Sequence, residues 1–182
     1  MHPEDVAEFV AESIGVLAEK LQLSPELGGT PDLEGVKLYI PFVKLERKLV
    51  QHTLDTGFVL PGGGGVSMVH QVPLLGQPPT ERDLILHLDL ADYDAQPPTA
   101  ELLRPDRSPL PAAEWPKSIH GQGIVASHKD YGRPFFCRRG LREYHTHPQH
   151  EDDPWDKYRE HLALHQIVIE LLDGLRNTWI GR

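Results

Sequence analysis

Residues 83–103 read DLILHLDLADYDAQPPTAELL, and this stretch decides the fold. Its first half places leucines at every second position: Leu84, Leu86, Leu88 and Leu90. Such alternation predicts a strand with one buried face. The double proline Pro97-Pro98 fixes φ and removes two hydrogen-bond donors, so the chain turns sharply at a sheet edge. We therefore expect a strand, a tight turn and a second strand, TAELLRPD, at 99–106.

Three more strands are expected upstream of this stretch. Residues 35–50 carry alternating apolar residues at Val36, Leu38, Ile40 and Phe42. HTLDTGFVL at 52–60 and VSMVHQVPLL at 66–75 follow, with the glycines from Gly62 to Gly65 between them as a hairpin tip. Together these strands predict an antiparallel meander.

Helices are expected at the two ends of the chain. Apolar residues at three- and four-residue steps predict one helix over Asp5–Leu21 and another from Trp155 to Trp179. On the second helix we expect His165 at the edge of the core and His161 on the surface. Between sheet and last helix, residues from Ser108 to Gly132 are rich in Pro, Gly and Ser and predict a long irregular segment. The order predicts one α+β domain over residues 1–182.

Composition excludes several classes of function. The 182 residues carry a formal charge of −9, which argues against nucleic acid or anionic lipid as a partner. No apolar run is long enough to span a bilayer, and the acidic N-terminus does not resemble a secretory signal. We therefore expect a cytoplasmic protein. Its only cysteine, Cys137, would remain a free thiol there.

Cys137 lies in GRPFFCRRG and has three possible roles, namely packing, metal ligation or covalent chemistry. Cationic neighbours stabilise a thiolate over a thiol. Four arginines lie within five residues of this cysteine: Arg133, Arg138, Arg139 and Arg142. The pattern favours a reactive sulfur.

The order of motifs resembles the ubiquitin-conjugating enzymes. Members of that family have a tyrosine three residues before a double proline, then a histidine-proline-asparagine motif, a glycine, the catalytic cysteine, and a tryptophan that leads into C-terminal helices. The matching positions, spread over Val36 to Leu175, are Tyr93, Pro97-Pro98, His128-Lys129-Asp130, Gly132, Cys137 and Trp155. The resemblance is to the divergent members found in bacterial ubiquitin-like conjugation and defence systems.

This resemblance implies a thioester mechanism. Cys137 would take the C-terminus of a ubiquitin-like protein from an activating enzyme and pass it to a target amine, without a cofactor. His128 and Asp130 would shape the site. The resemblance is incomplete, because the segments on both sides of Cys137 are longer than usual and Asp130 replaces the asparagine. An ionised carboxylate cannot donate a hydrogen bond to an oxyanion, so Asp130 would serve as a base for the amine.

Other side chains are expected to border the site: Tyr93, by packing, and Arg138, Arg139, His145 and His147. Either of these histidines would be poised near neutral pH as a base.

Two alternatives remain open. The first is a catalytically silent relative that binds a ubiquitin-like protein or its activating enzyme, with Cys137 buried. The second is a zinc-binding protein, because a thiolate and imidazoles suit Zn²⁺. The four candidate ligands are Cys137, His145, His147 and His150.

Overall fold

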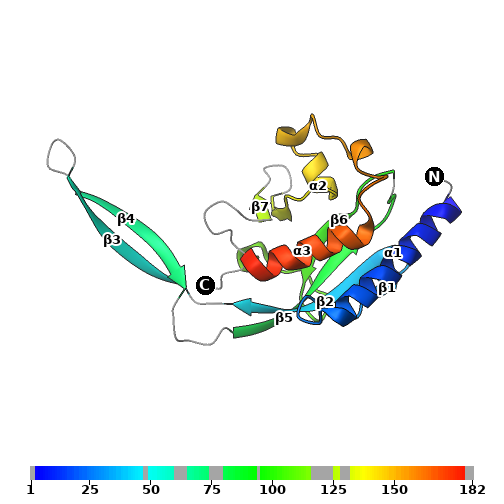
Figure 1. Ribbon diagram of the computed structural model, residues 1–182, viewed down its shortest axis with the longest axis horizontal. Helices are drawn as coiled ribbons and strands as arrows, with labels where there is room; N and C mark the ends of the chain where they lie inside the picture. The colour runs from blue at the N-terminus through cyan, green and yellow to red at the C-terminus, as the bar shows by residue number, and fades with distance from the viewer. Residues whose placement is uncertain are drawn as a thin grey trace.

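The computed structural model describes residues 3–46, 49–59, 65–73, 80–93, 95–115, 125–127 and 132–178. Its longer elements are α1 (Pro3–Leu23), β2 (Lys37–Glu46), β3 (Leu49–Val59), β4 (Gly65–Pro73), β5 (Thr80–Asp89) and α3 (Leu164–Thr178). Shorter ones are β1 (Asp32–Glu34), β6 (Thr99–Leu103), β7 (Val125–Ser127), β8 (Pro134–Phe136), α2 (Arg142–His145) and the 3₁₀ turns η1 (Ala112–Glu114), η2 (Pro148–His150) and η3 (Trp155–Lys157). Helix, antiparallel sheet, irregular segment and helix follow in the expected α+β order (Figure 1).

The central sheet has four antiparallel strands in the order β1-β2-β5-β6. Its register places Leu38 opposite Leu88 and Ile40 opposite Leu86, so the alternating residues of both strands share one face. All four side chains are buried in the core. The helices α1 and α3 contact each other and cover this face (Figure 1). Each such buried leucine contributes about 1.5–3 kcal/mol through removal of apolar surface from water.

The predicted meander is interrupted. The strands expected at 52–60 and 66–75 form as β3 and β4, but they pair with each other as a separate two-stranded ribbon. β2 pairs directly with β5, from Lys37 opposite Asp89 to Glu46 opposite Thr80. These two strands have matching apolar faces, which explains their direct pairing. Most of the glycine tip, residues 62–64, lies outside the described residues, and Gly65 begins β4.

The C-terminal helix begins later than predicted. Trp155–Lys157 is a 3₁₀ turn, and α3 starts at Leu164 instead of at Trp155. The side chain of Gln166 accepts a hydrogen bond from the backbone N–H of Ala163 at 2.9 Å, which caps this later start. The predicted helix was therefore too long at its N-terminal end. Tyr158 and Leu162, the first apolar residues at helical spacing, lie in the turn before α3. As expected, His161 is exposed and His165 is half-buried.

The described residues of the segment predicted as loop from Ser108 to Gly132 include two short elements. One is the turn η1, after which Trp115 is buried against Phe136 with ring centroids 5.1 Å apart. The indole N–H of Trp115 donates to the carbonyl of Leu110 at 3.0 Å. The other element is β7, which pairs with β8. Phe135 and Phe136 of β8 are both buried, so the backbone that leads into Cys137 is firmly anchored.

Among the described residues, no helix combines the length and apolarity needed to cross a bilayer.

Gly140, in the segment after Cys137, lies close to Leu162 and Ile167 near the start of α3. Its φ of +91° lies in the left-handed region that favours glycine. A Cβ at this position would approach Leu162 to 2.7 Å and Ile167 to 2.9 Å. The backbone therefore approaches the core so closely here that only glycine fits.

We predict that Gly140→Ala destabilises the protein by about 2–4 kcal/mol, from overpacking added to the cost of a positive φ. Chemical denaturation measures this loss. Gly132→Ala is the matched control, since Gly132 has a φ of +59° but open space around it, and should cost only about 1 kcal/mol. Equal losses in the two variants would contradict the packing argument.

Candidate functional site

The turn between β5 and β6 is built around Tyr93. Its ring is buried between Phe9 and Trp155, with centroids 6.5 Å from each. Two backbone hydrogen bonds close the turn, from Tyr93 N–H to the carbonyl of Leu90 and from Gln96 N–H to the carbonyl of Asp92. Tyr93 therefore packs as predicted and joins helix α1 to the segment that opens at Trp155.

Arg142 fastens this turn to the segment that carries Cys137. Its Nε donates to the carbonyl of Pro97 at 3.2 Å, and its Nη2 donates to the carbonyl of Ala91 at 3.0 Å. Its backbone N–H donates to the carbonyl of Pro98 at 2.9 Å. The two regions that sequence motifs singled out are thus adjacent in the fold.

Cys137 lies directly after β8 and is half-buried, whereas Phe135 and Phe136 before it are fully buried. Its Sγ lies 3.5 Å from Nε2 of His150. Burial raises the pKa of the Cys137 thiol, and the positive charge of Arg138 lowers it by a smaller amount. The sulfur therefore carries its proton at neutral pH, and the thiol can donate to Nε2 of His150 when that nitrogen is unprotonated.

Three of the four nearby arginines are held by other groups. Arg133 pairs with Glu101 at 3.3 Å, and Arg139 pairs with Asp153 at 3.3 Å. Arg142 is bound to backbone carbonyls. Only Arg138, which is exposed, acts on the charge of the sulfur. The expected effect of nearby arginines on the thiol therefore comes from Arg138 alone, because the other three are held by closer acceptors.

His145 has a structural role. Its Nε2 accepts a hydrogen bond from the backbone N–H of Gly140 at 3.2 Å, so its Nδ1 carries the proton and donates to the carbonyl of Asp153 at 2.7 Å. Burial lowers the pKa of His145, which favours this neutral form. With both ring nitrogens engaged, His145 shapes the loop and has no free nitrogen with which to act as a base.

His147 and His150 lie at the two ends of the turn η2. The Nδ1 of His147 accepts a hydrogen bond from the backbone N–H of Gln149 at 3.2 Å, and its ring stacks on Phe135 at 5.8 Å. The ring of His150 stacks closely on Tyr144, with centroids 3.9 Å apart and planes at 15°. Of the three clustered histidines, His150 is the one whose ring meets the sulfur.

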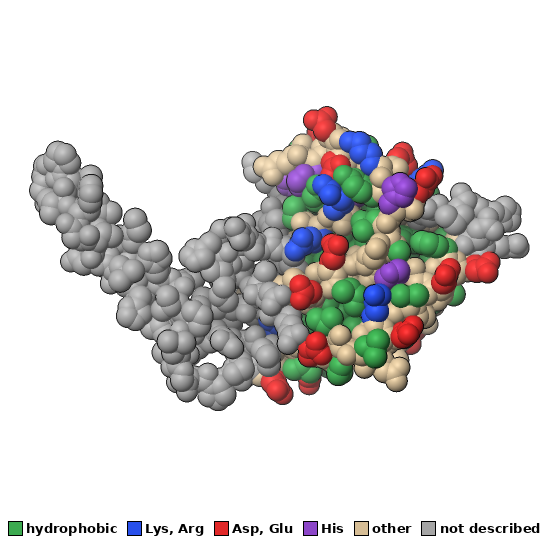
Figure 2. Space-filling view, in the orientation of Figure 1, with side chains coloured by type: hydrophobic (Ala, Val, Ile, Leu, Met, Phe, Trp, Pro, Cys, Tyr) green, Lys and Arg blue, Asp and Glu red, His purple; other side chains and the backbone are tan. Residues whose placement is uncertain are grey.

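Asp153 holds the loop behind these rings. Its carboxylate accepts hydrogen bonds from the hydroxyls of Tyr144, at 2.9 Å, and Tyr158, and it pairs with Arg139. The bond from Tyr158, helped by Tyr144 and Arg139, lowers the pKa of Asp153 against the opposing effect of partial burial. The guanidinium of Arg139 also lies 4.6 Å above the ring of Tyr158. Figure 2 shows histidine, arginine and acidic side chains interspersed on this surface, above α3.

No group of three or more His, Cys, Asp or Glu side chains within the described ranges is arranged to hold a metal ion. Cys137 and His150 do meet, but His145 uses both nitrogens on the backbone. His128 and Asp130, the other predicted catalytic residues, lie outside the described residues.

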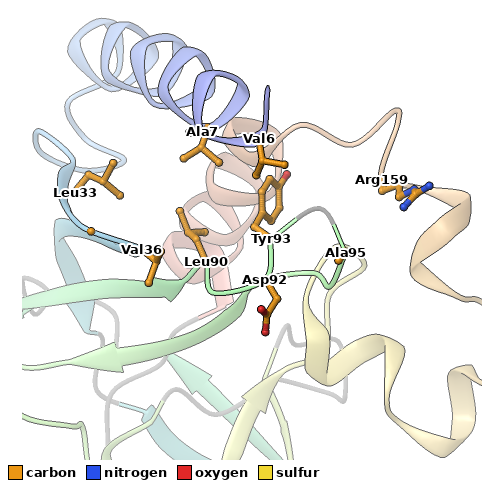
Figure 3. Close-up of a pocket in the computed structure, with 11 residues that line it drawn as sticks. Val6, Ala7, Leu33, Val36, Leu90, Asp92, Tyr93, Ala95 and Arg159 are labelled. Atoms are coloured by element: carbon orange, nitrogen blue, oxygen red, sulfur yellow. The ribbon is translucent and has the colours of Figure 1, made fainter. Parts of the chain in front are cut away.

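A pocket of about 590 Å³ opens on the other side of Tyr93 (Figure 3). Val6 and Val10 of α1 form one wall, and Leu33 and Val36 near the β1–β2 turn form another. Leu33 and Val36 remain 41% and 52% exposed, which is unusual for large apolar side chains. The pocket is also lined by two charged residues, Asp92 and Arg159. It offers an apolar surface to a partner.

Comparison with known proteins identifies no relative, because no family model matches this chain and no curated protein does so either.

Sequence reasoning missed two residues of this site. His150 was predicted as a candidate zinc ligand and not as the ring that contacts the sulfur, although Pro148 after His147 signals a turn that brings it back toward Cys137. Asp153 is the last of three consecutive acidic residues. Nothing in the sequence distinguishes it from Glu151 and Asp152, which are exposed.

We predict that Asp153→Asn lowers stability at pH 7. Because the pKa of Asp153 is lowered on folding, its contribution is present above the unfolded value of about 3.9 and is lost as pH falls through the folded value. The difference in denaturation midpoint between wild type and Asp153→Asn should become smaller below about pH 4.

Asp156→Asn is the control, since Asp156 is 80% exposed and makes only a 3.8 Å contact with Arg159. A gap for Asp153→Asn that stays constant from pH 7 to pH 3 would contradict the charged role of Asp153.

Proposed function

We propose that this protein is a divergent ubiquitin-conjugating enzyme that carries a ubiquitin-like protein as a thioester on Cys137. One observation carries the proposal. The only thiol of the chain is half-buried at the end of an anchored strand, with an imidazole against its sulfur, beside the Tyr93–Pro98 turn.

The arrangement of the motifs supports this proposal. Arg142 ties the double-proline turn to the segment after Cys137, and Trp155 contacts Tyr93. These positions were chosen from the sequence for their order, and they are far apart along the chain. Contacts between these distant positions, on the segment that carries Cys137, support the proposed assignment to this family.

The proposed reaction exchanges one thioester for another. The sulfur of Cys137 attacks the carbonyl carbon of the thioester on an activating enzyme, a new C–S bond forms, and the cysteine of the activating enzyme leaves with a proton. A target amine then attacks the carbonyl carbon, an amide forms, and Cys137 regains a proton. Thiol and amine chemistry is sufficient for both steps, so the reaction needs no cofactor.

Other parts of the proposal rest on the resemblance alone. His128 and Asp130 would shape the site, with Asp130 as a base for the amine. The partners would be a ubiquitin-like protein, its activating enzyme and a target protein, in a reducing cytoplasm where the thiol stays free. A role in bacterial defence belongs to the same proposal.

A second candidate function is a binding module on the same fold. The specific observation in its favour is the apolar pocket beside Tyr93, together with the raised pKa of the thiol. A silent relative would bind a ubiquitin-like protein or its activating enzyme through this pocket and would use Cys137 only for packing.

We predict that incubation with ATP, an activating enzyme and a ubiquitin-like protein encoded in the same genome produces an adduct on Cys137. The adduct should be cleaved by reductant and absent in Cys137→Ala, on non-reducing gels and by intact mass. Cys137→Ser should give an oxygen ester that resists reductant. With partners verified to react with each other, absence of any adduct would favour the binding module.

If the pocket docks a partner, Val36→Asp should weaken binding at least about tenfold, because a charge would be placed on an apolar contact. Calorimetric titration with the same two proteins measures this. Leu23→Asp is the control, because Leu23 is 77% exposed and does not line the pocket. Equal effects of the two substitutions would remove the pocket from the interface.

A further inference from the structure

The contact between Cys137 and His150 places a proton acceptor on the nucleophile. Their Sγ and Nε2 atoms lie 3.5 Å apart, within hydrogen-bonding distance for a thiol, and both side chains are half-buried. The two residues are thirteen positions apart in the sequence, one before α2 and one after it. The contact is therefore made by the fold of the loop and not by neighbouring positions in the sequence.

Several groups fix the ring of His150. Tyr144 stacks on one side, and the hydroxyl of Tyr144 is itself held by Asp153 at 2.9 Å. The backbone N–H of His150 donates to the carbonyl of His147 at 2.8 Å, and the carbonyl of His150 accepts from the N–H of Asp153 at 2.9 Å. An imidazole held on both its ring and its backbone is positioned before any substrate arrives.

The sulfur needs such a partner. Three of its four neighbouring arginines are occupied elsewhere, and burial favours the protonated thiol. A thiol attacks slowly, whereas a thiolate, or a thiol losing its proton during the attack, is a strong nucleophile.

We propose that His150 is the catalytic base of Cys137, an assignment that rests on the proposed thioester function. Nε2 takes the proton of Cys137 as the C–S bond to the incoming acyl group forms, and the imidazolium returns it to the departing thiolate of the activating enzyme. In the second step Nε2 takes a proton from the attacking amine and delivers it to the Cys137 thiolate as the C–S bond breaks. Protons balance in both steps.

Charged and titratable groups surround this pair. Arg138 acts on the sulfur, and the stacked ring of Tyr144 and the ring of His147, 5.6 Å away, flank His150. The charges of His150, Arg139 and Asp153 all act on His145.

The test uses iodoacetamide on the full chain, in which a thiol adduct can form only on Cys137 because the chain has one cysteine, and Cys137→Ala gives the background from other groups. We expect the wild type, followed by intact mass, to be alkylated at pH 7 because the imidazole takes the proton of the thiol. His150→Gln should lose at least about tenfold at pH 7. At a pH high enough to ionise the thiol without a base, the two rates should converge.

His161→Gln, an exposed histidine outside the site, is the control and should retain the wild-type profile. In His150→Ala, added imidazole should restore the rate at neutral pH, which separates loss of the base from loss of structure. Superimposable profiles for wild type and His150→Gln would overturn the assignment, as would a deficit that persists unchanged at a pH where the thiol is fully ionised.

The two proposals fail separately. If no adduct with a ubiquitin-like protein forms but alkylation depends on His150, the thioester function is wrong and the Cys137–His150 pair remains a reactive centre. If the adduct forms equally fast in His150→Gln, the function stands and the assigned base is wrong.

Discussion

The direct pairing of β2 with β5 is the constraint on which the rest of the molecule depends. It brings two alternating rows of apolar side chains onto one face, which α1 and α3 then cover. A register shift of one residue would place the two rows on opposite faces of the sheet, so this pairing admits one solution. It also fixes where β5 ends, and therefore where the Tyr93–Pro98 turn projects toward the segment of Cys137.

The site is held by contacts to the backbone more than by ion pairs on the surface. The side chain of Arg142 binds the carbonyls of Ala91 and Pro97. The ring of His145 binds main-chain groups of Gly140 and Asp153. Such contacts fix the path of the loop itself. The sulfur and His150 can then meet on a segment with little regular secondary structure, where long-range position is otherwise poorly defined.

The sequence alone predicted the structure correctly where its apolar pattern has only one interpretation. The alternating leucines from Leu84 to Leu90 predicted β5 and its inner face, and the double proline predicted the turn. The apolar stripe after Trp155 was misleading, since residues of a packed turn can keep helical spacing. The arginines near Cys137 were equivalent in sequence, and only the fold provided Glu101, Asp153 or a carbonyl as a nearer acceptor.

The ribbon of β3 and β4 has a consequence for how this chain can vary. It is inserted between two strands that already pair with each other, and its own strands pair only together in the described residues. The entropy of closing a connection grows only slowly with its length, so a longer or shorter excursion here would change the stability of the sheet little. The ribbon is therefore an appendage that can change in size and sequence while the central sheet and its covering helices stay the same.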